Sequence, residues 1–190
     1  MPPKNKFTRD EIVTAALALT REAGIEALTA RTLAARLGTS TKPIFGAFSS
    51  MDEVREAVSD AAMALYQNYL REDMERGKYP PYKASGMGYI RFAREEPPLF
   101  RLLFMCDRSD VRDFTDPEEL PIILSIIRNN LGLSEEDARL FHIEMWVAVH
   151  GIAVMTATSY LPWDEEMIST VLSDIYLGLS ARFKERRNAE

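Results

Sequence analysis

The sequence predicts an all-α protein with a short three-helix head, a longer antiparallel helical bundle and about nine helices in total. Three observations support this fold class. Apolar residues recur at three- and four-residue spacing in nearly every segment, which is the pattern of one helix face. Capping residues and glycines divide the chain into pieces of helix length. No run alternates between apolar and polar residues over the length of a strand, and this argues against a sheet.

The first helix is predicted to begin after Thr8 and to end at Gly24. Thr8 and Glu11 have the spacing of a capping box, in which each side chain satisfies a backbone N–H of the other residue. Glycine adopts the left-handed conformation that commonly ends a helix. The apolar positions that follow the cap lie on one face: Ile12, Ala16, Leu19 and Ala23.

Two short helices are predicted next, joined by a tight turn at Gly38. Thr29 caps the first of them, and Pro43 falls in the first turn of the second, where its missing N–H does little harm. This is the spacing of a helix-turn-helix motif. Small or apolar residues occupy the positions where the two helices cross: Ala34, Leu37, Ile44 and Phe48. Polar residues stand at the outward start of the second: Ser40, Thr41 and Lys42.

The remaining chain is predicted to form longer helices. Ser50 and Glu53 have capping-box spacing and open a helix that runs to Gly77. The helices after it are expected over residues 82–95, 99–106, 116–131, 134–161 and 164–187.

Charge is unevenly distributed along the chain. The net charge is −6, but residues 1–50 carry +3 and the remainder carries −9. A basic head on an acidic body indicates that one end of the molecule meets a polyanion.

The single cysteine, Cys106, excludes a disulfide framework, fits a reducing compartment and is expected to be buried. The longest apolar stretch, Met145–Ala157, is interrupted by His150 and is too short to span a bilayer, so we expect a cytoplasmic protein without membrane contact.

The run from Thr29 to Ser40, TARTLAARLGTS, and the run IFGAFSSMDEV that begins at Ile44 resemble the DNA-binding region of the tetracycline-repressor (TetR) family. The segment Trp146–Gly151, WVAVHG, resembles the Trp…His-Gly signature of one class of TetR-type C-terminal domains. The resemblance implies a helix-turn-helix domain over residues 1–50 and a ligand-binding and dimerisation domain over residues 51–190. It implies a repressor that binds a palindromic DNA operator as a homodimer and is released by a small-molecule effector.

The resemblance also implies DNA contacts by position. In the family the start of the second helix touches phosphate, and the third helix enters the major groove, where a lysine such as Lys42 contacts guanine or phosphate. The residues expected to contact DNA are Lys4, Lys6, Thr29, Arg31, Ser40, Thr41, Lys42, Pro43, Phe45 and Gly46.

Three positions depart from the family pattern. The family usually has tyrosine where Phe45 stands, histidine or tyrosine where Ala47 stands, and lysine where Met51 stands. Each change removes a phosphate partner and lowers the salt dependence of DNA binding by about one unit. We therefore expect weak or salt-tolerant DNA binding, or compensation from a basic N-terminal arm that contains Lys4, Lys6 and Arg9. The alternative function is a helical small-molecule-binding or protein-interaction module whose head has lost DNA binding.

The last two long helices carry more apolar surface than one chain needs. The first presents Ile143, Trp146, Val147, His150, Val154 and Ala157, and the second presents Val171, Ile175, Leu179 and Phe183. Such helices pair with a second copy as a four-helix bundle. The alternative is that both faces are internal core.

Methionines and aromatics gather in the C-terminal part and can line an adaptable apolar pocket or simply fill core. With the resemblance they suggest a site for an apolar or amphipathic effector, made by Met63, Tyr66, Phe92, Phe100, Phe104, Met105, Met145, Trp146 and His150. His142 and His150 are eight residues apart, too far for a zinc pair on one helix, and are expected to be hydrogen-bonded packing residues. No catalytic residue, metal or cofactor is predicted, and the protein is not expected to be an enzyme.

Overall fold

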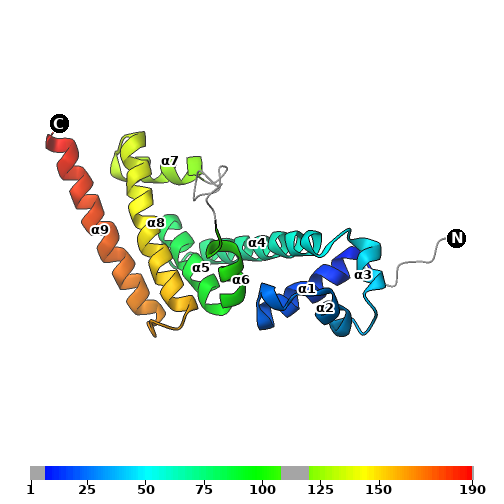
Figure 1. The fold of residues 1–190 in the computed structure, drawn as a ribbon. Helices are drawn as coiled ribbons and strands as arrows, with labels where there is room; N and C mark the ends of the chain where they lie inside the picture. The colour runs from blue at the N-terminus through cyan, green and yellow to red at the C-terminus, as the bar shows by residue number, and fades with distance from the viewer. Residues whose placement is uncertain (1–6, 108–119, 190) are drawn as a thin grey trace. The chain divides into compact units, whose positions relative to one another are not determined.

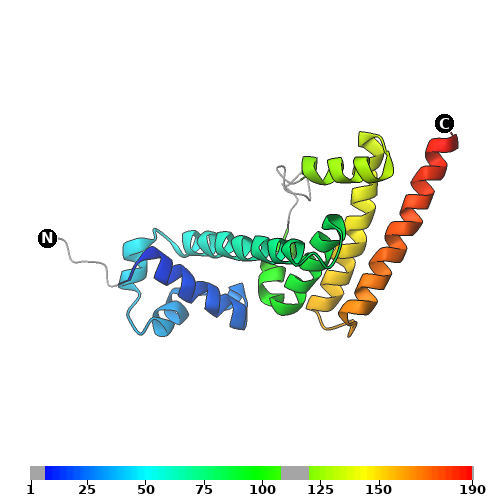
Figure 2. The same ribbon diagram turned by 180° about the vertical axis from the view of Figure 1, so that it is seen from behind.

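The computed structural model describes residues 7–107 and 120–189, and within these ranges it contains nine α-helices, one 3₁₀ helix and no strand (Figures 1 and 2). The predicted all-α fold is confirmed. The elements are α1 (Arg9–Ala23), η1 (Ile25–Ala27), α2 (Ala30–Arg36), α3 (Lys42–Ala47), α4 (Met51–Arg76), α5 (Pro81–Glu95), α6 (Pro97–Phe104), α7 (Leu120–Leu131), α8 (Glu135–Ala157) and α9 (Glu165–Ala189). Lys4, Lys6 and the predicted helix start at Asp116 lie outside the described residues.

The chain divides into two compact units. The first unit comprises Met1–Asn68 and Glu95–Cys106, and the second comprises Tyr69–Arg94 and Asp107–Glu190. α4 therefore contributes residues to both units, and α6 belongs to the first unit although it follows α5 in the chain. The domain boundary predicted at residue 50 stays a prediction.

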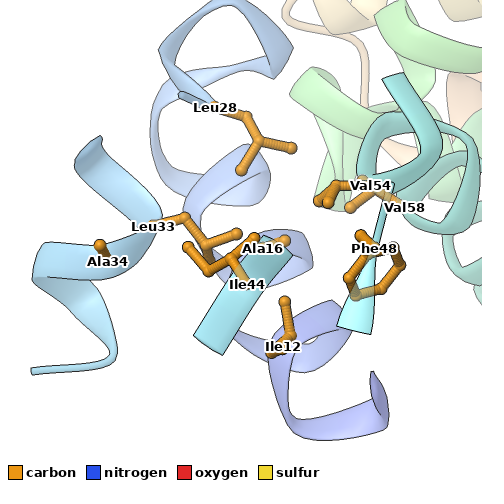
Figure 3. Close-up of a cluster of buried hydrophobic side chains, with 9 residues drawn as sticks. All are labelled: Ile12, Ala16, Leu28, Leu33, Ala34, Ile44, Phe48, Val54 and Val58. Atoms are coloured by element: carbon orange, nitrogen blue, oxygen red, sulfur yellow. The ribbon is translucent and has the colours of Figure 1, made fainter. Parts of the chain in front are cut away.

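The first unit has its own apolar core (Figure 3). Side chains from α1, α2, α3 and the start of α4, together with the C-cap residues of η1 and α3, converge there: Ile12, Ala16, Leu28, Leu33, Ala34, Ile44, Phe48, Val54 and Val58. Three of the four residues predicted at the crossing of the short helices are buried in this cluster, and the fourth, Leu37, packs against it partly buried. The sequence did not predict η1, which closes the connection between α1 and α2 and precedes the fully buried Leu28.

Helix caps follow the predictions with one exception. Thr8 and Glu11 form the predicted box at the start of α1, and Thr29 caps α2. At α4 only half of the predicted box forms, because the Glu53 N–H donates to Ser50 Oγ at 3.2 Å while the Glu53 carboxylate does not return to Ser50. Instead it accepts from the N–H of Ser49 at 2.6 Å and from its hydroxyl at 2.7 Å. Its other oxygen accepts from Arg9 Nη1 at 2.6 Å, which draws the carboxylate across to α1.

The contacts of Glu53 predict an acid-sensitive link in the first unit. Hydrogen bonds from Ser49, and then the Arg9 guanidinium, lower the pKa of Glu53 from its ordinary value of 4.5 to about 2. A carboxyl with a depressed folded-state pKa stabilises the fold above the unfolded value and loses this contribution as it is protonated. Glu53→Gln is therefore expected to destabilise the protein at pH 7, and the difference from wild type should shrink between pH 4.5 and about pH 2.

Urea unfolding of both proteins across this pH range tests the prediction. Glu56→Gln changes an exposed glutamate of the same helix and is the matched control. A stability difference between wild type and Glu53→Gln that is constant from pH 7 to pH 3 would contradict it.

In the second unit α8 and α9 run side by side (Figures 1 and 2). Phe141 of α8 is fully buried and meets the rings of Tyr176 and Phe183 of α9 edge-to-face, with centroids 5.4 and 5.6 Å apart. Phe183 and Ala157 belong to the two apolar faces for which pairing with a second copy and internal core were the alternatives, and both are core residues within one chain. Apolar periodicity identifies a helix face and leaves open which partner covers it.

Both histidines are hydrogen-bonded packing residues, as predicted. The Tyr82 hydroxyl hydrogen-bonds His142 Nδ1 at 3.1 Å, and the Tyr89 hydroxyl hydrogen-bonds His150 Nδ1 at 2.9 Å. Both tyrosines lie on α5, so these bonds join α5 to α8. Partial burial lowers the pKa of His150, which favours the neutral imidazole at neutral pH.

Two further expectations change in the structure. Cys106 was expected to be buried, but it is exposed just beyond the end of α6. The apolar stretch in α8 was judged too short for a membrane span, whereas within the described residues the whole of α8 is long and apolar enough by length and composition. The core helices of soluble proteins also reach this length and apolar composition, so the finding is weak evidence for a membrane span. Of the most apolar 18-residue stretch of α8, 33% is buried within one chain.

Candidate nucleic-acid interface

α2 and α3 form a helix-turn-helix whose turn is fixed by backbone hydrogen bonds. The backbone N–H of Thr39 donates to Ala34 O at 3.0 Å, and the N–H of Gly38 donates to Ala35 O at 3.1 Å. Gly38 has a φ of +62°, a left-handed conformation that a side chain disfavours. The turn therefore holds α3 at a defined angle to α2, with Ile44 anchored in the core of the first unit.

α2 begins with a capping box formed by Thr29 and Thr32, and the exposed cation Arg31 lies beside it. Thr29 Oγ1 accepts from the N–H of Thr32 at 3.2 Å, and the Thr32 hydroxyl donates to Ala27 O at 2.7 Å. Thr29 and Arg31 are both exposed. The predicted phosphate contact of Thr29 thus falls on a residue that also fixes the helix start.

α3 has a buried side and an exposed side. Ile44 and Phe48 face the core, while Pro43 is half-buried. The predicted DNA-contacting residues Ser40, Thr41, Lys42, Phe45 and Gly46 are all exposed. Thr41 is the N-cap residue by position, but its side chain forms no capping hydrogen bond. The sequence and the structure therefore place the same residues on the outward surface of the motif.

Ion pairing distinguishes six described cations of the first unit from one another. Four arginines bind carboxylates in the pairs Arg9–Glu53, Arg21–Glu96, Arg36–Glu22 and Arg55–Asp52. Within residues 7–107, Arg31 and Lys42 form neither an ion pair nor a hydrogen bond. An exposed cation without a carboxylate partner is available to an external anion. These two residues stand at the starts of α2 and α3, where the sequence predicts DNA contacts.

The three departures from the family pattern take different positions. Phe45 is 48% exposed, whereas Ala47 and Met51 are partly buried against the core cluster of the first unit. Arg9, proposed above for a basic arm, lies in the first turn of α1. Its guanidinium donates to Glu53 and to Ala47 O at 3.2 Å, and it lies 4.0 Å from the Phe48 ring centroid. Arg9 thus packs α1 against the end of α3, a role that its sequence neighbours do not reveal.

The residues predicted to bind an effector fall in both units. In the first unit Phe100 is fully buried, Tyr66 and Phe104 meet edge-to-face at 5.0 Å, and Met63 and Met105 are exposed.

In the second unit Phe92 and Met145 are buried, while Trp146 and His150 are half-buried. The Trp146 ring stacks on the His150 imidazole with centroids 4.7 Å apart and planes 8° apart. With the Tyr89 hydroxyl, this makes a small aromatic cluster between α5 and α8. The predicted effector site stays a prediction.

Comparison with known proteins agrees with this geometry. Residues 12–58 match the family described as bacterial regulatory proteins, tetR family, and residues 82–173 match the tetracyclin repressor-like C-terminal domain. The chain is also similar to an uncharacterized HTH-type transcriptional regulator of Mycobacterium tuberculosis, with 25% identity over 95% of this chain and 84% of the relative. The first match covers α2 and α3 together with the exposed cations at their starts. We conclude that this chain is a DNA-binding transcriptional regulator of the tetracycline-repressor (TetR) family.

Proposed function

We propose that this protein is a cytoplasmic, ligand-responsive transcriptional repressor that binds a palindromic operator as a homodimer. The observation that carries the DNA-binding role is the pair of cations Arg31 and Lys42, which lie on the exposed starts of the two helices of the helix-turn-helix and form no ion pair within the described residues. Phosphate contacts supply most of the affinity of such proteins, and groove contacts supply sequence preference.

The exposed faces of α8 and α9 support the dimer. Val147 is 60% exposed and Leu177 is 63% exposed. Gly151 follows Val147 by one helical turn, Gly178 adjoins Leu177, and a Cβ built at either glycine would meet nothing within 4 Å. Small and apolar positions of this kind let a second pair of helices approach closely in a four-helix bundle. Twofold pairing also places two recognition helices about 34 Å apart, on successive major-groove faces of a palindrome.

Continuity of α4 supports the response to an effector. This helix contributes to the core of the first unit through Val54 and Val58 and continues into the second unit from Tyr69. An effector changes DNA affinity only through a different affinity for two conformations of the protein. The cluster of Tyr89, Trp146 and His150 supports an apolar or amphipathic effector with a group that hydrogen-bonds.

Salt titration of operator binding tests the DNA-binding role. The slope of log K against log salt falls by about 0.9 for each phosphate contact removed. In a homodimer Arg31→Met or Lys42→Met is expected to reduce the slope by about 1.8, and the double variant by about 3.6. Arg71→Met removes the same charge from an exposed position in the second unit and is the matched control.

The same variants separate the proposal from its alternative, a regulatory module that has lost DNA binding. Phe45, Ala47 and Met51 motivate this alternative, because each replaces a phosphate partner of the family pattern. If the wild type binds no DNA specifically at low salt and the double variant still regulates as the wild type does, the repressor proposal is wrong and the alternative is favoured.

A further inference from the structure

Phe45 is the large apolar residue that the helix-turn-helix exposes. Within residues 7–50 every other large hydrophobic side chain is buried or partly buried, while 48% of Phe45 is exposed. This segment is well packed, because Ile44 is fully buried and Phe48 is only 3% exposed. The exposure of Phe45 is therefore specific to this side chain. The helix directs two apolar side chains into the core and one outward.

The surroundings of Phe45 are suited to a polyanion. Lys42 precedes it by three residues and Thr41 by four, so the three side chains share one helix face. All three are exposed, and Lys42 has no carboxylate partner among the described residues. A cation and a hydroxyl therefore flank an aromatic ring that has no hydrogen-bonding group. A polyanionic partner that also offers an apolar group complements this face.

In the DNA major groove the apolar group of that kind is the 5-methyl of thymine. The other base edges offer hydrogen-bond donors and acceptors, while the thymine methyl accepts apolar contact. A phenyl ring laid over a donor or acceptor removes its water and returns no hydrogen bond, which is unfavourable. The ring of Phe45 is therefore complementary to thymine and discriminates against the remaining bases.

We propose that Phe45 determines specificity by contacting the 5-methyl group of a thymine in each operator half-site. The inference rests on the proposed function, since it requires that α3 enter the major groove. It gives Phe45, one of the residues expected to contact DNA, a specific partner at a position where the family usually has a phosphate-binding tyrosine.

Deoxyuridine substitution tests this contact because it removes the methyl group and leaves the base-pairing edge unchanged. The full-length protein is first used to select an operator from a random duplex library, and each thymine is then replaced by deoxyuridine in both half-sites. One symmetry-related thymine pair is expected to respond. Loss of one methyl contact weakens binding by about fourfold, and loss of both by about 15-fold.

Phe45 variants connect the effect to the side chain. Phe45→Ala is expected to bind the thymine and deoxyuridine operators with a ratio within about twofold, whereas Phe45→Leu, which keeps apolar contact, retains part of the discrimination. Lys42→Met lowers affinity for both operators and preserves their ratio. Because Phe45 is exposed, thermal unfolding of these variants should match that of the wild type.

The outcomes separate the two proposals. A selected half-site without thymine, or a full deoxyuridine effect in Phe45→Ala, overturns the thymine contact and leaves DNA binding intact. If selection enriches no sequence at low salt, the proposed function fails, and this inference fails with it.

Discussion

A Leu177→Glu variant is expected to sediment as a single chain and to lose operator binding. Leu177 lies on the face of α9 that the proposed four-helix bundle covers, and 63% of it is exposed in one chain. A glutamate there would be removed from water in both copies of the twofold interface, at several kcal/mol per ion. A monomer presents only one recognition helix, so the increase in DNA affinity that comes from binding two linked half-sites is lost as well.

The control is Ile122→Glu, which introduces the same charge at an isoleucine of α7 that is equally exposed. This variant should remain dimeric and bind the operator. Sedimentation equilibrium measures the mass, and circular dichroism checks that both variants keep their helices. A Leu177→Glu protein that stays dimeric with unchanged DNA affinity would show that this face of α9 is not the interface.

Arg21→Met is expected to destabilise the first unit by about 3 kcal/mol, at the lower end of the effect of breaking a buried ion pair because Arg21 is half-exposed. The Glu96 side chain is only 5% exposed and lies at the start of α6, where two guanidinium nitrogens of Arg21 bind its two oxygens. Arg21 Nε donates to Glu96 Oε2 at 2.7 Å. Removing the guanidinium leaves a buried carboxylate without its cation.

A second variant distinguishes lost charge compensation from lost packing. Adding Glu96→Gln to Arg21→Met removes the uncompensated charge, so the double variant should be more stable than Arg21→Met alone. Urea unfolding gives the three free energies. Arg21 lies in α1 and Glu96 at the start of α6, so the pair joins these two helices. If the double variant is less stable than Arg21→Met, or if Arg21→Met costs under about 1 kcal/mol, compensation of the Glu96 charge is not what stabilises this contact.

Helix boundaries could largely be read from the sequence because the interactions that set them are local. The Thr8–Glu11 box joins residues three positions apart, and Gly24, Gly38 and Gly77 each adopt the positive φ that a helix end or turn requires. The helix-turn-helix could also be predicted from the sequence, because its turn, cap and crossing residues all lie within the 20 residues from Thr29 to Phe48. The pattern also predicted the outward placement of Lys42, whereas the outward placement of Phe45 followed from the family resemblance. Both residues are exposed.

Tertiary structure alone decided which side chains satisfy one another. Glu53 binds Arg9 across 44 positions and Arg21 binds Glu96 across 75. No spacing rule therefore indicates that these two arginines form ion pairs while Arg31 and Lys42 form none in the part of the chain that the structure describes. The sequence left the apolar face of Phe183 open between a second copy and internal core for the same reason, since periodicity defines a helix face and only packing determines what covers it. Local sequence thus determined the helices and which residues of the helix-turn-helix are exposed. Long-range contacts, whose geometry depends on the whole fold, determined which charges and apolar faces remain available to a partner.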